Sequence, residues 1–335
     1  MNSLVSLLAE TFAARADLFD ANHETAFRLF HGFSEGCPTL AIEIYARTIV
    51  LHDYATVGDF LQDKQIVLQE VQEHLHSQFP WLRAILLKTH RSSIFSVRQG
   101  VLLYGEKVDQ RIREHGVSYA VELRMHGDTS FYLDTRNLRA WALQHLNGKT
   151  VLNTFAYTGS LGVASLAGGA RRVVHLDHNR AFLNVAKASY SLNGFPINKG
   201  DFQVGDFWTQ VNYLKRTGER FDCVLLDPPF FSTTNRGTVD LVTQSQRVIN
   251  KVRPLINDGG YLIATNNALF VSGADYFHSL EVLCADGYLS IEALLPVPLD
   301  CTGYPQTTVG APPADPTPFN HPTKIAVLRV RRKET

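Results

Sequence analysis

The fold is decided by residues 150–177, which read TVLNTFAYTGSLGVASLAGGARRVVHLD. Two short apolar runs rich in β-branched residues, 150–157 and 172–177, flank a glycine-bearing turn and a segment long enough for a helix. A strand, a helix and a second strand in this order predict a right-handed crossover between parallel strands. Ligands of such sheets bind where the carboxyl ends of the strands meet.

The same alternation continues along the chain. Further strands are predicted in FQVGDF (202–207), FDCVLLD (221–227) and GYLIATN (260–266), with helical segments between them. Residues 296–322 hold eight of the fourteen prolines and predict an irregular loop, after which KIAVLRV (324–330) predicts a returning strand. We therefore predict an α/β fold with a parallel sheet covered on both faces.

Residues 1–100 lack the regular alternation of strands and helices, and their pattern predicts a smaller α+β domain. Apolar residues of an amphipathic helix recur at Leu4, Leu7, Leu8, Phe12 and Leu18. Strands are predicted within 41–53 and 83–89, and a helix from about Asp59 to His76. The predicted organisation is residues 1–100 as this domain, 101–149 as a connecting β-hairpin segment, and 150–335 as the sheet domain.

Composition excludes several classes of protein. The net charge is zero and 45% of the residues are hydrophobic, which argues against a disordered chain, and no apolar run is long enough to span a membrane. The four cysteines lie far apart without CxxC spacing, and the N-terminus lacks a basic segment typical of a signal peptide, so we expect a cytoplasmic protein without a metal site. The first 100 residues hold eight basic and eleven acidic side chains, so a nucleic acid would bind the remainder.

Polar residues at the predicted strand ends are candidate cofactor ligands. Gly159 permits close backbone approach at the first turn, although such a turn also serves helix packing. Asp177 ends the second strand, where an acid can bind a ribose diol or cap a helix. Asp206 and Phe207 follow the third strand, and they are suited either to an adenine or to a helix cap.

The most specific local signal is DPPFF at residues 227–231. Two consecutive prolines remove two backbone donors and stiffen the loop, while the aromatic residues beyond them can stack on a flat ring. A proline-rich turn with buried phenylalanines is the alternative. Because DPPFF lies at the carboxyl end of a predicted strand, where ligands bind, we favour the interpretation that its aromatic rings stack on a ligand.

The ordered motifs resemble the class I S-adenosylmethionine-dependent methyltransferases, with their Rossmann-like sheet. GDTSFYLDTR (127–136) is similar to the "TGFFLDQR" segment of the large-subunit ribosomal RNA methyltransferases, a group that includes cytosine-C5 and guanine-N7 enzymes of bacterial 23S rRNA. Residues 26–45 are similar to that group's entry into its central α+β domain, and the resemblance covers most of residues 25–330. The group's N-terminal PUA domain is not matched, and Ser130, Thr135 and His178 depart from its pattern.

The resemblance implies S-adenosyl-L-methionine as cofactor and assigns roles residue by residue. The implied cofactor-binding residues are Asp134, Arg136, Asn153, Phe155, Tyr157, Thr158, Gly159, Asp177, His178, Asp206, Phe207 and Asp227. The implied catalytic residues are Asp227, Pro228, Pro229, Phe230 and Asn266.

The methylated atom is inferred from the missing nucleophile. Cytosine C5 requires a cysteine thiolate, but ATNNA (264–268) stands where the C5 enzymes carry a cysteine. Cys223 and Cys284 are predicted to be core thiols, and Cys301 is an isolated loop thiol. A base nitrogen, guanine N7 or an exocyclic amine, carries its own lone pair and needs orientation only.

We therefore predict a methyltransferase that modifies a base nitrogen of ribosomal RNA, expected to be 23S, or of another nucleic acid. The alternatives are a cytosine-C5 enzyme, a methyltransferase of small molecules or proteins, and a non-catalytic RNA-binding assembly factor. The sequence leaves open the modified nucleotide, naked RNA versus a ribosomal particle, a role for Cys301, and whether the protein is a homodimer.

Overall fold

The computed structural model describes residues 4–55, 64–125 and 127–332, and the chain divides into two compact units. Unit 1 comprises Met1–Leu133 with Pro298–Ala311, and unit 2 comprises Asp134–Val297 with Pro312–Thr335. Residues 101–133, assigned from the sequence to a connecting segment, thus lie within unit 1.

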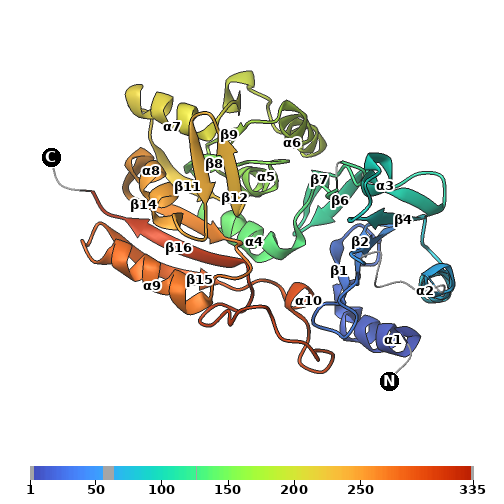
Figure 1. Ribbon diagram of the computed structural model, residues 1–335. Coiled ribbons are helices and arrows are strands. Elements are labelled where there is room, and N and C mark those ends of the chain that lie inside the picture. The colour runs from blue at the N-terminus through green and yellow to red at the C-terminus, as the bar shows by residue number, and fades with distance from the viewer. Residues whose placement is uncertain (1–3, 56–63, 126, 333–335) are drawn as a thin grey trace. The chain divides into compact units, whose positions relative to one another are not determined.

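Unit 1 is built on a five-stranded sheet in the order β1-β2-β3-β4-β5. Its pairs are antiparallel except for β3 and β4, which are parallel. Figure 1 labels its strands β1, β2 and β4. The strands are β1 Ala26–His31, β2 Leu40–Tyr45, β3 Thr48–Asp53, β4 Ala84–Thr89 and β5 Val101–Tyr104. The remaining elements are α1 Leu4–Ala14, η1 Ala16–Leu18, α2 Lys64–Gln78, α3 Phe95–Gln99, β6 Arg111–Glu114, β7 Val117–Ala120 and α10 Leu299–Thr302.

Helices α1 and α2 supply the apolar side chains that cover one face of this sheet. Leu8 and Phe12 of α1, together with Val71 and Leu75 of α2, are buried in one cluster with the apolar strand residues. The amphipathic N-terminal helix predicted from the sequence is therefore confirmed up to Ala14, whereas Leu18 lies in the separate 3-10 turn η1. The predicted start of the next helix, at Asp59, lies outside the described residues.

A buried ion pair explains why residues 298–311 belong to unit 1. Arg15 donates from Nη1 to Glu35 Oε1 at 2.9 Å, and both side chains are fully buried. The Thr307 hydroxyl donates to the same carboxylate, and the Arg28 backbone N–H donates to Asp300 Oδ2 at 2.9 Å. Since a buried charge is costly unless it is paired, these bonds fix the segment to the first sheet.

Unit 2 contains the predicted α/β sheet, with seven strands in the order β10-β9-β8-β11-β14-β16-β15. The five strands from β10 to β14 are parallel, and β16 is antiparallel to both of its neighbours. The strands are β8 Thr150–Thr154, β9 Arg172–Asp177, β10 Phe202–Val204, β11 Phe221–Leu226, β14 Ile256–Asn266, β15 Leu289–Leu295 and β16 Lys324–Val330.

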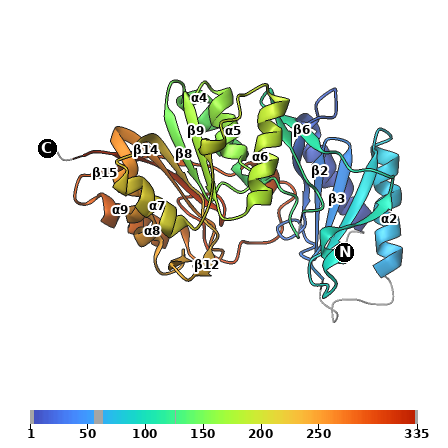
Figure 2. The ribbon, with the colours of Figure 1, turned by 90° about the horizontal axis from the view of Figure 1, so that it is seen from above.

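Helices cover both faces of this sheet, as Figure 2 shows. On one face α4 and α5 pack against Val151, Val173 and Leu225, whereas the alternate residues Leu152 and Val224 face α7, α8 and α9. The fully buried strands explain the near-continuous apolar runs in the sequence. The helices are α4 Arg136–His145, α5 Ser160–Ala167, α6 Arg180–Leu192, α7 Phe207–Arg216, α8 Ser245–Val252 and α9 Gly273–Cys284, with 3-10 turns η2 Leu133–Thr135, η3 Lys199–Asp201 and η4 Arg253–Leu255.

Three strands of unit 2 were not predicted from the sequence. A hairpin, β12 Phe231–Thr234 with β13 Gly237–Asp240, comes between β11 and α8. The edge strand β15 precedes the predicted returning strand β16. Among the described residues, no helix is both long and apolar enough to cross a bilayer.

Candidate active site

The predicted site residues of unit 2 follow the carboxyl ends of neighbouring parallel strands. FAYTG follows β8, Asp177 ends β9, Asp206 lies two residues beyond β10, and Asp227 directly follows β11. Because β10, β9, β8 and β11 are parallel neighbours, these residues share one edge of the sheet.

The FAYTG loop has an unusual backbone. Phe155, Tyr157 and Gly159 all have positive φ angles, of 51°, 50° and 78°. The left-handed region is strained for the two aromatic residues, and such strain is concentrated at ligand sites. The loop is held by hydrogen bonds, since the Ala156 N–H donates to Leu176 O at 2.9 Å.

Gly159 caps α5 and is required sterically. A Cβ at this position would lie 2.5 Å from the Cβ of Ala186. The packing interpretation of this glycine is therefore correct, and it leaves the loop's close approach to a cofactor open as a second role. Thr158, beside it, is buried.

Asp177 is buried, and its carboxylate joins the FAYTG loop to the turn before α6. Tyr157 N–H donates to Oδ2 and Asn179 N–H donates to Oδ1, each at 2.8 Å. Burial raises the pKa of Asp177, and these backbone hydrogen bonds oppose the rise. The residue that caps α6 is Asn179, whose side chain accepts from Ala181 N–H, so the simple helix-cap alternative for Asp177 is wrong. A carboxylate has about four acceptor positions, so Asp177 retains capacity for a ribose diol.

Asp206 is the N-cap of α7, as its structural alternative predicted. Its Oδ1 accepts from Thr209 N–H at 3.0 Å and its Oδ2 from the Thr234 hydroxyl at 2.8 Å. Although partial burial opposes it, these bonds lower the pKa of Asp206. Phe207 is buried in the core and packs on Phe155, with ring centroids 4.5 Å apart.

Asn153 belongs to a buried polar chain beneath the loop. Its Nδ2 lies 3.3 Å from Nδ1 of His175, and His175 Nε2 lies 2.8 Å from the Tyr190 hydroxyl. Burial lowers the pKa of His175 to about 3, so this ring is neutral at physiological pH. The His175 ring lies next to Gly159 and Gly162, where any added Cβ would collide with it or crowd it. No sequence motif marks His175 as a support of this loop.

The carboxylates of Asp227 and Asp134 interact electrostatically. Burial and the Asp134 carboxylate raise the pKa of Asp227 to about 7, and the Thr265 side chain opposes the rise. Asp134 lies in η2, and its Oδ2 accepts from the Thr323 hydroxyl at 2.9 Å. Two carboxylates held together in this way favour a cationic ligand, because a positive charge relieves their repulsion. Thr323 could not be found from any sequence motif.

The loops after β11 and β14 carry exposed aromatic rings. These strands are parallel neighbours, and Asn267 Nδ2 donates to Pro228 O at 3.2 Å, which joins the two loops. The side chains of Phe230 and Phe231 are 58% and 55% exposed, and that of Phe270 is 82% exposed. Large exposed rings are unfavourable in water, so this rim is suited to stacking on a flat partner. The buried-phenylalanine alternative for DPPFF is wrong.

The other predicted residues occupy varied positions. Pro228 is buried and Pro229 is exposed, while Asn266 is buried at the end of β14. Arg136 is the partly buried first residue of α4. His178 is highly exposed, with Nδ1 3.5 Å from Asp177 Oδ1.

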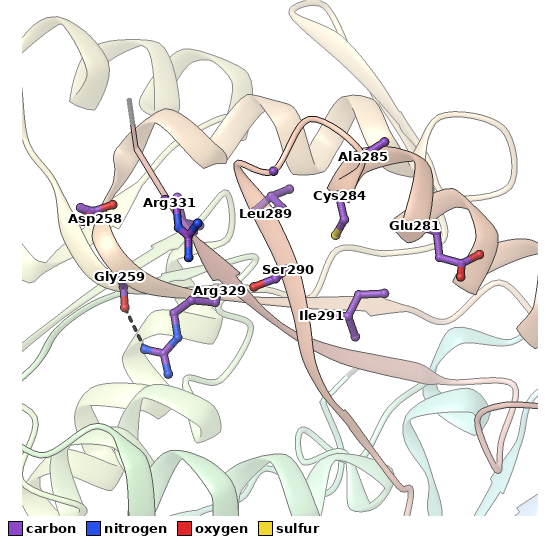
Figure 3. Close-up of a pocket in the computed structure, with 12 residues that line it drawn as sticks. Asp258, Gly259, Glu281, Cys284, Ala285, Leu289, Ser290, Ile291, Arg329 and Arg331 are labelled. Atoms are coloured by element: carbon purple, nitrogen blue, oxygen red, sulfur yellow. Dashed lines mark hydrogen bonds between the residues drawn. The ribbon is translucent and has the colours of Figure 1, made fainter. Parts of the chain in front are cut away.

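A pocket of about 650 Å³ lies elsewhere in unit 2 (Figure 3). It is lined by β15, β16, the end of α9 and the amino-terminal part of β14, including Asp258 and Gly259. The predicted site residues lie at the opposite edge of the sheet, where the parallel strands have their carboxyl ends. Arg329 in this pocket already binds Glu292 and Gly259 O, at 2.7 and 2.8 Å, so its charge is neutralised locally.

A model of the S-adenosylmethionine-dependent methyltransferase family matches residues 68–292, more than half of the chain. The chain belongs to this family. The enzyme class and cofactor expected from the sequence are those of the family. The matched region contains every predicted site residue from Asp134 to Asn266.

Two named relatives are similar to this chain over part of their own length. YwbD of Bacillus subtilis, named as a proposed ribosomal RNA large subunit methyltransferase, is 28% identical over 79% of this chain and 66% of its own. Ribosomal RNA large subunit methyltransferase I of Photobacterium profundum is 29% identical over 76% of this chain and 62% of its own. The chain thus spans about two thirds of these relatives or less.

The fold also matches solved structures. The crystal structure of SMU.776, a proposed methyltransferase complexed with SAH, has a TM-score of 0.80 at 22% identity. The alignment covers 97% of this chain and 80% of that one. This likeness confirms the predicted fold class, a methyltransferase sheet with an additional N-terminal α+β unit.

Proposed function

We propose that this protein transfers a methyl group from S-adenosylmethionine to a base of large-subunit ribosomal RNA. Its relatives carry that substrate in their names, and the exposed aromatic rim beside Asp227 is the observation that carries the proposal for this chain. Phe230, Phe231 and Phe270 supply π-faces that can stack on an unpaired base, as single-stranded RNA recognition requires.

The residues around the rim fit the cofactor. S-adenosylmethionine carries an ammonium and a sulfonium, and the Asp134–Asp227 pair offers the negative charge that such a ligand needs. Asp177 would hold the ribose, and the FAYTG loop would lie against the methionine part. When bound, the cofactor supplies an electrophilic methyl group, and the protein's task is to orient an acceptor atom toward it.

We further propose that the acceptor is a base nitrogen. A C5 enzyme needs a thiolate, but burial raises the pKa of the Cys223 thiol far above its ordinary value, and burial also raises that of Cys284. Cys223 is a fully buried core thiol within β11, whereas Cys284 ends α9 and is partly buried beside the core, so the prediction of a core thiol is correct for Cys223 only. In unit 1 Cys301 is fully buried in α10. These placements support the nitrogen assignment over cytosine C5, and guanine N7 or an exocyclic amine is the acceptor.

The proposal is tested by comparing rRNA nucleosides from wild-type and deletion strains by mass spectrometry. We expect one N-methylated base to disappear, and purified protein with labelled S-adenosylmethionine should restore it on rRNA from the deletion strain. Loss of 5-methylcytidine would overturn the nitrogen assignment. An unchanged nucleoside profile and unmethylated RNA in vitro would overturn the RNA assignment.

Removing the exposed rings should weaken RNA recognition and spare cofactor binding. For the double variant Phe230→Ala/Phe231→Ala we expect kcat/KM for rRNA to fall about tenfold or more, because each base–aromatic stack contributes about 1–3 kcal/mol. Titration with S-adenosylmethionine should give an affinity within about twofold of wild type. Tyr213→Ala, which removes an exposed ring from α7, is the matched control and should retain wild-type activity. Equal kcat/KM for all three proteins would refute a stacking role.

A further inference from the structure

Two adjacent asparagines at the end of β14 differ in what they bind. Asn266 uses both ends of its amide: Nδ2 donates to Leu241 O, and Oδ1 accepts from Ala268 N–H, both at 3.0 Å. Its side chain is buried, so these bonds hold the turn that follows the strand. The amide that the sequence assigned to catalysis is therefore engaged in backbone contacts.

Asn267 has one engaged and one unengaged end. Its Nδ2 donates to Pro228 O at 3.2 Å, and a carbonyl can only accept, so the orientation of this amide is fixed. Its Oδ1 is buried and has no hydrogen-bond partner within the described ranges 4–55, 64–125 and 127–332. A buried acceptor left unpaired costs about 1–3 kcal/mol, a cost that a bound N–H donor would remove.

Asn267 lies on one of the two loops that carry the exposed aromatic rim, and the proposed function places the target base on this rim. Pro228 directly follows Asp227, and the exposed rings of Phe230 and Phe270 lie on the same two joined loops. A base stacked on these rings presents its edge, and its N–H groups, to the polar atoms of the loops. Pro228 O also retains a second lone pair for a donor.

Resting on the proposed function, we infer that Asn267 is a specificity-determining residue. Its Oδ1 accepts a hydrogen bond from an N–H of the target base, while its Nδ2 positions the Pro228 carbonyl beside the acceptor atom. Asn267 thus contacts the base, whereas Asn266, which the resemblance implied to be catalytic, holds the turn. Substitution of Asn267 should therefore lower activity, and substitution of Asn266 should lower stability.

The experiment compares Asn267→Ala with Asn266→Ala in the full chain. Asn267→Ala should lower kcat/KM for rRNA about tenfold or more, with the melting temperature within about 2 °C and cofactor affinity within about twofold of wild type. Asn266→Ala leaves Leu241 O and Ala268 N–H buried without partners, so it should lower the melting temperature by several degrees.

The outcomes separate the inference from the function on which it rests. If wild-type protein does not methylate rRNA, the proposed function fails. If wild type is active and Asn267→Ala matches its kcat/KM, the inference alone is overturned. If Asn267→Ala loses as much thermal stability as Asn266→Ala, the residue is structural and the inference is equally overturned.

Discussion

Asp227→Asn is expected to abolish most methyl transfer, with kcat/KM falling about 100-fold or more and S-adenosylmethionine binding weakened about tenfold or more at pH 8. The reason is that the ionised Asp227 carboxylate, next to Asp134, provides charge for a cationic ligand. The pKa of Asp227 is about 7, so lowering the pH from 8 to 6 protonates it and should weaken wild-type binding about tenfold. The variant should show no such pH dependence.

Although Asp227→Asn should lower activity and cofactor binding, it should raise the stability of the fold. An unfolded Asp titrates near pH 3.9, whereas Asp227 in the fold titrates near 7, so the folded state holds the proton more tightly. Stability present below about pH 4 is therefore lost as the pH rises toward 7. Asp227→Asn avoids that loss and should raise the melting temperature by several degrees at pH 8 and by about a third of that amount at pH 5.

Calorimetric titration with S-adenosylmethionine at pH 8 and 6 checks the effect on binding, and thermal melts at pH 8 and 5 check the effect on stability. Asp286→Asn, which removes an exposed carboxylate from the turn after α9, is the charge-matched control and should bind the cofactor like wild type. Wild-type affinity in Asp227→Asn, or a pH-independent affinity in the wild type, would show that this carboxylate does not hold the cofactor.

The sequence predicted unit 2 well because its strands are buried on both faces. Runs such as FDCVLLD and KIAVLRV stand out against amphipathic helices, and β16 coincides with its predicted range, residues 324–330. The parallel order then places Asp177 and Asp227 on one edge through topology alone. β15 was missed because an edge strand is half exposed and lacks a continuous apolar run.

The fine structure of the site could not be predicted in the same way. Asn266 and Asn267 are adjacent residues of the same type, so the sequence gives no reason to assign them different roles. Their roles differ because Asn266 binds Leu241 O and Asn267 binds Pro228 O in the folded chain. Phe207 is buried in the apolar core of unit 2 and packs on Phe155, whose backbone is left-handed, and neither feature follows from a sequence motif. Likewise, the raised pKa of Asp227 depends on its burial and on Asp134, which is 93 positions away in the sequence.

Asp177→Ala should nearly eliminate cofactor binding, with the dissociation constant for S-adenosylmethionine rising about 30-fold or more. The alanine removes a ribose acceptor and also leaves the N–H groups of Tyr157 and Asn179 without their partner, so the strained loop loses its support. Titration calorimetry measures this effect, and Asp177→Asn retains one acceptor oxygen as the milder comparison.

A cofactor analogue separates the two roles of Asp177. Wild-type protein should bind S-adenosylhomocysteine more tightly than the same compound lacking the ribose 2′-hydroxyl, because the carboxylate accepts from that hydroxyl. Asp177→Asn should weaken this preference, since the substitution and the missing hydroxyl affect the same interaction and their free energies are then not additive. If Asp177→Asn discriminates between the two compounds as strongly as wild type, the carboxylate supports only the loop, and the ribose must be held by other residues.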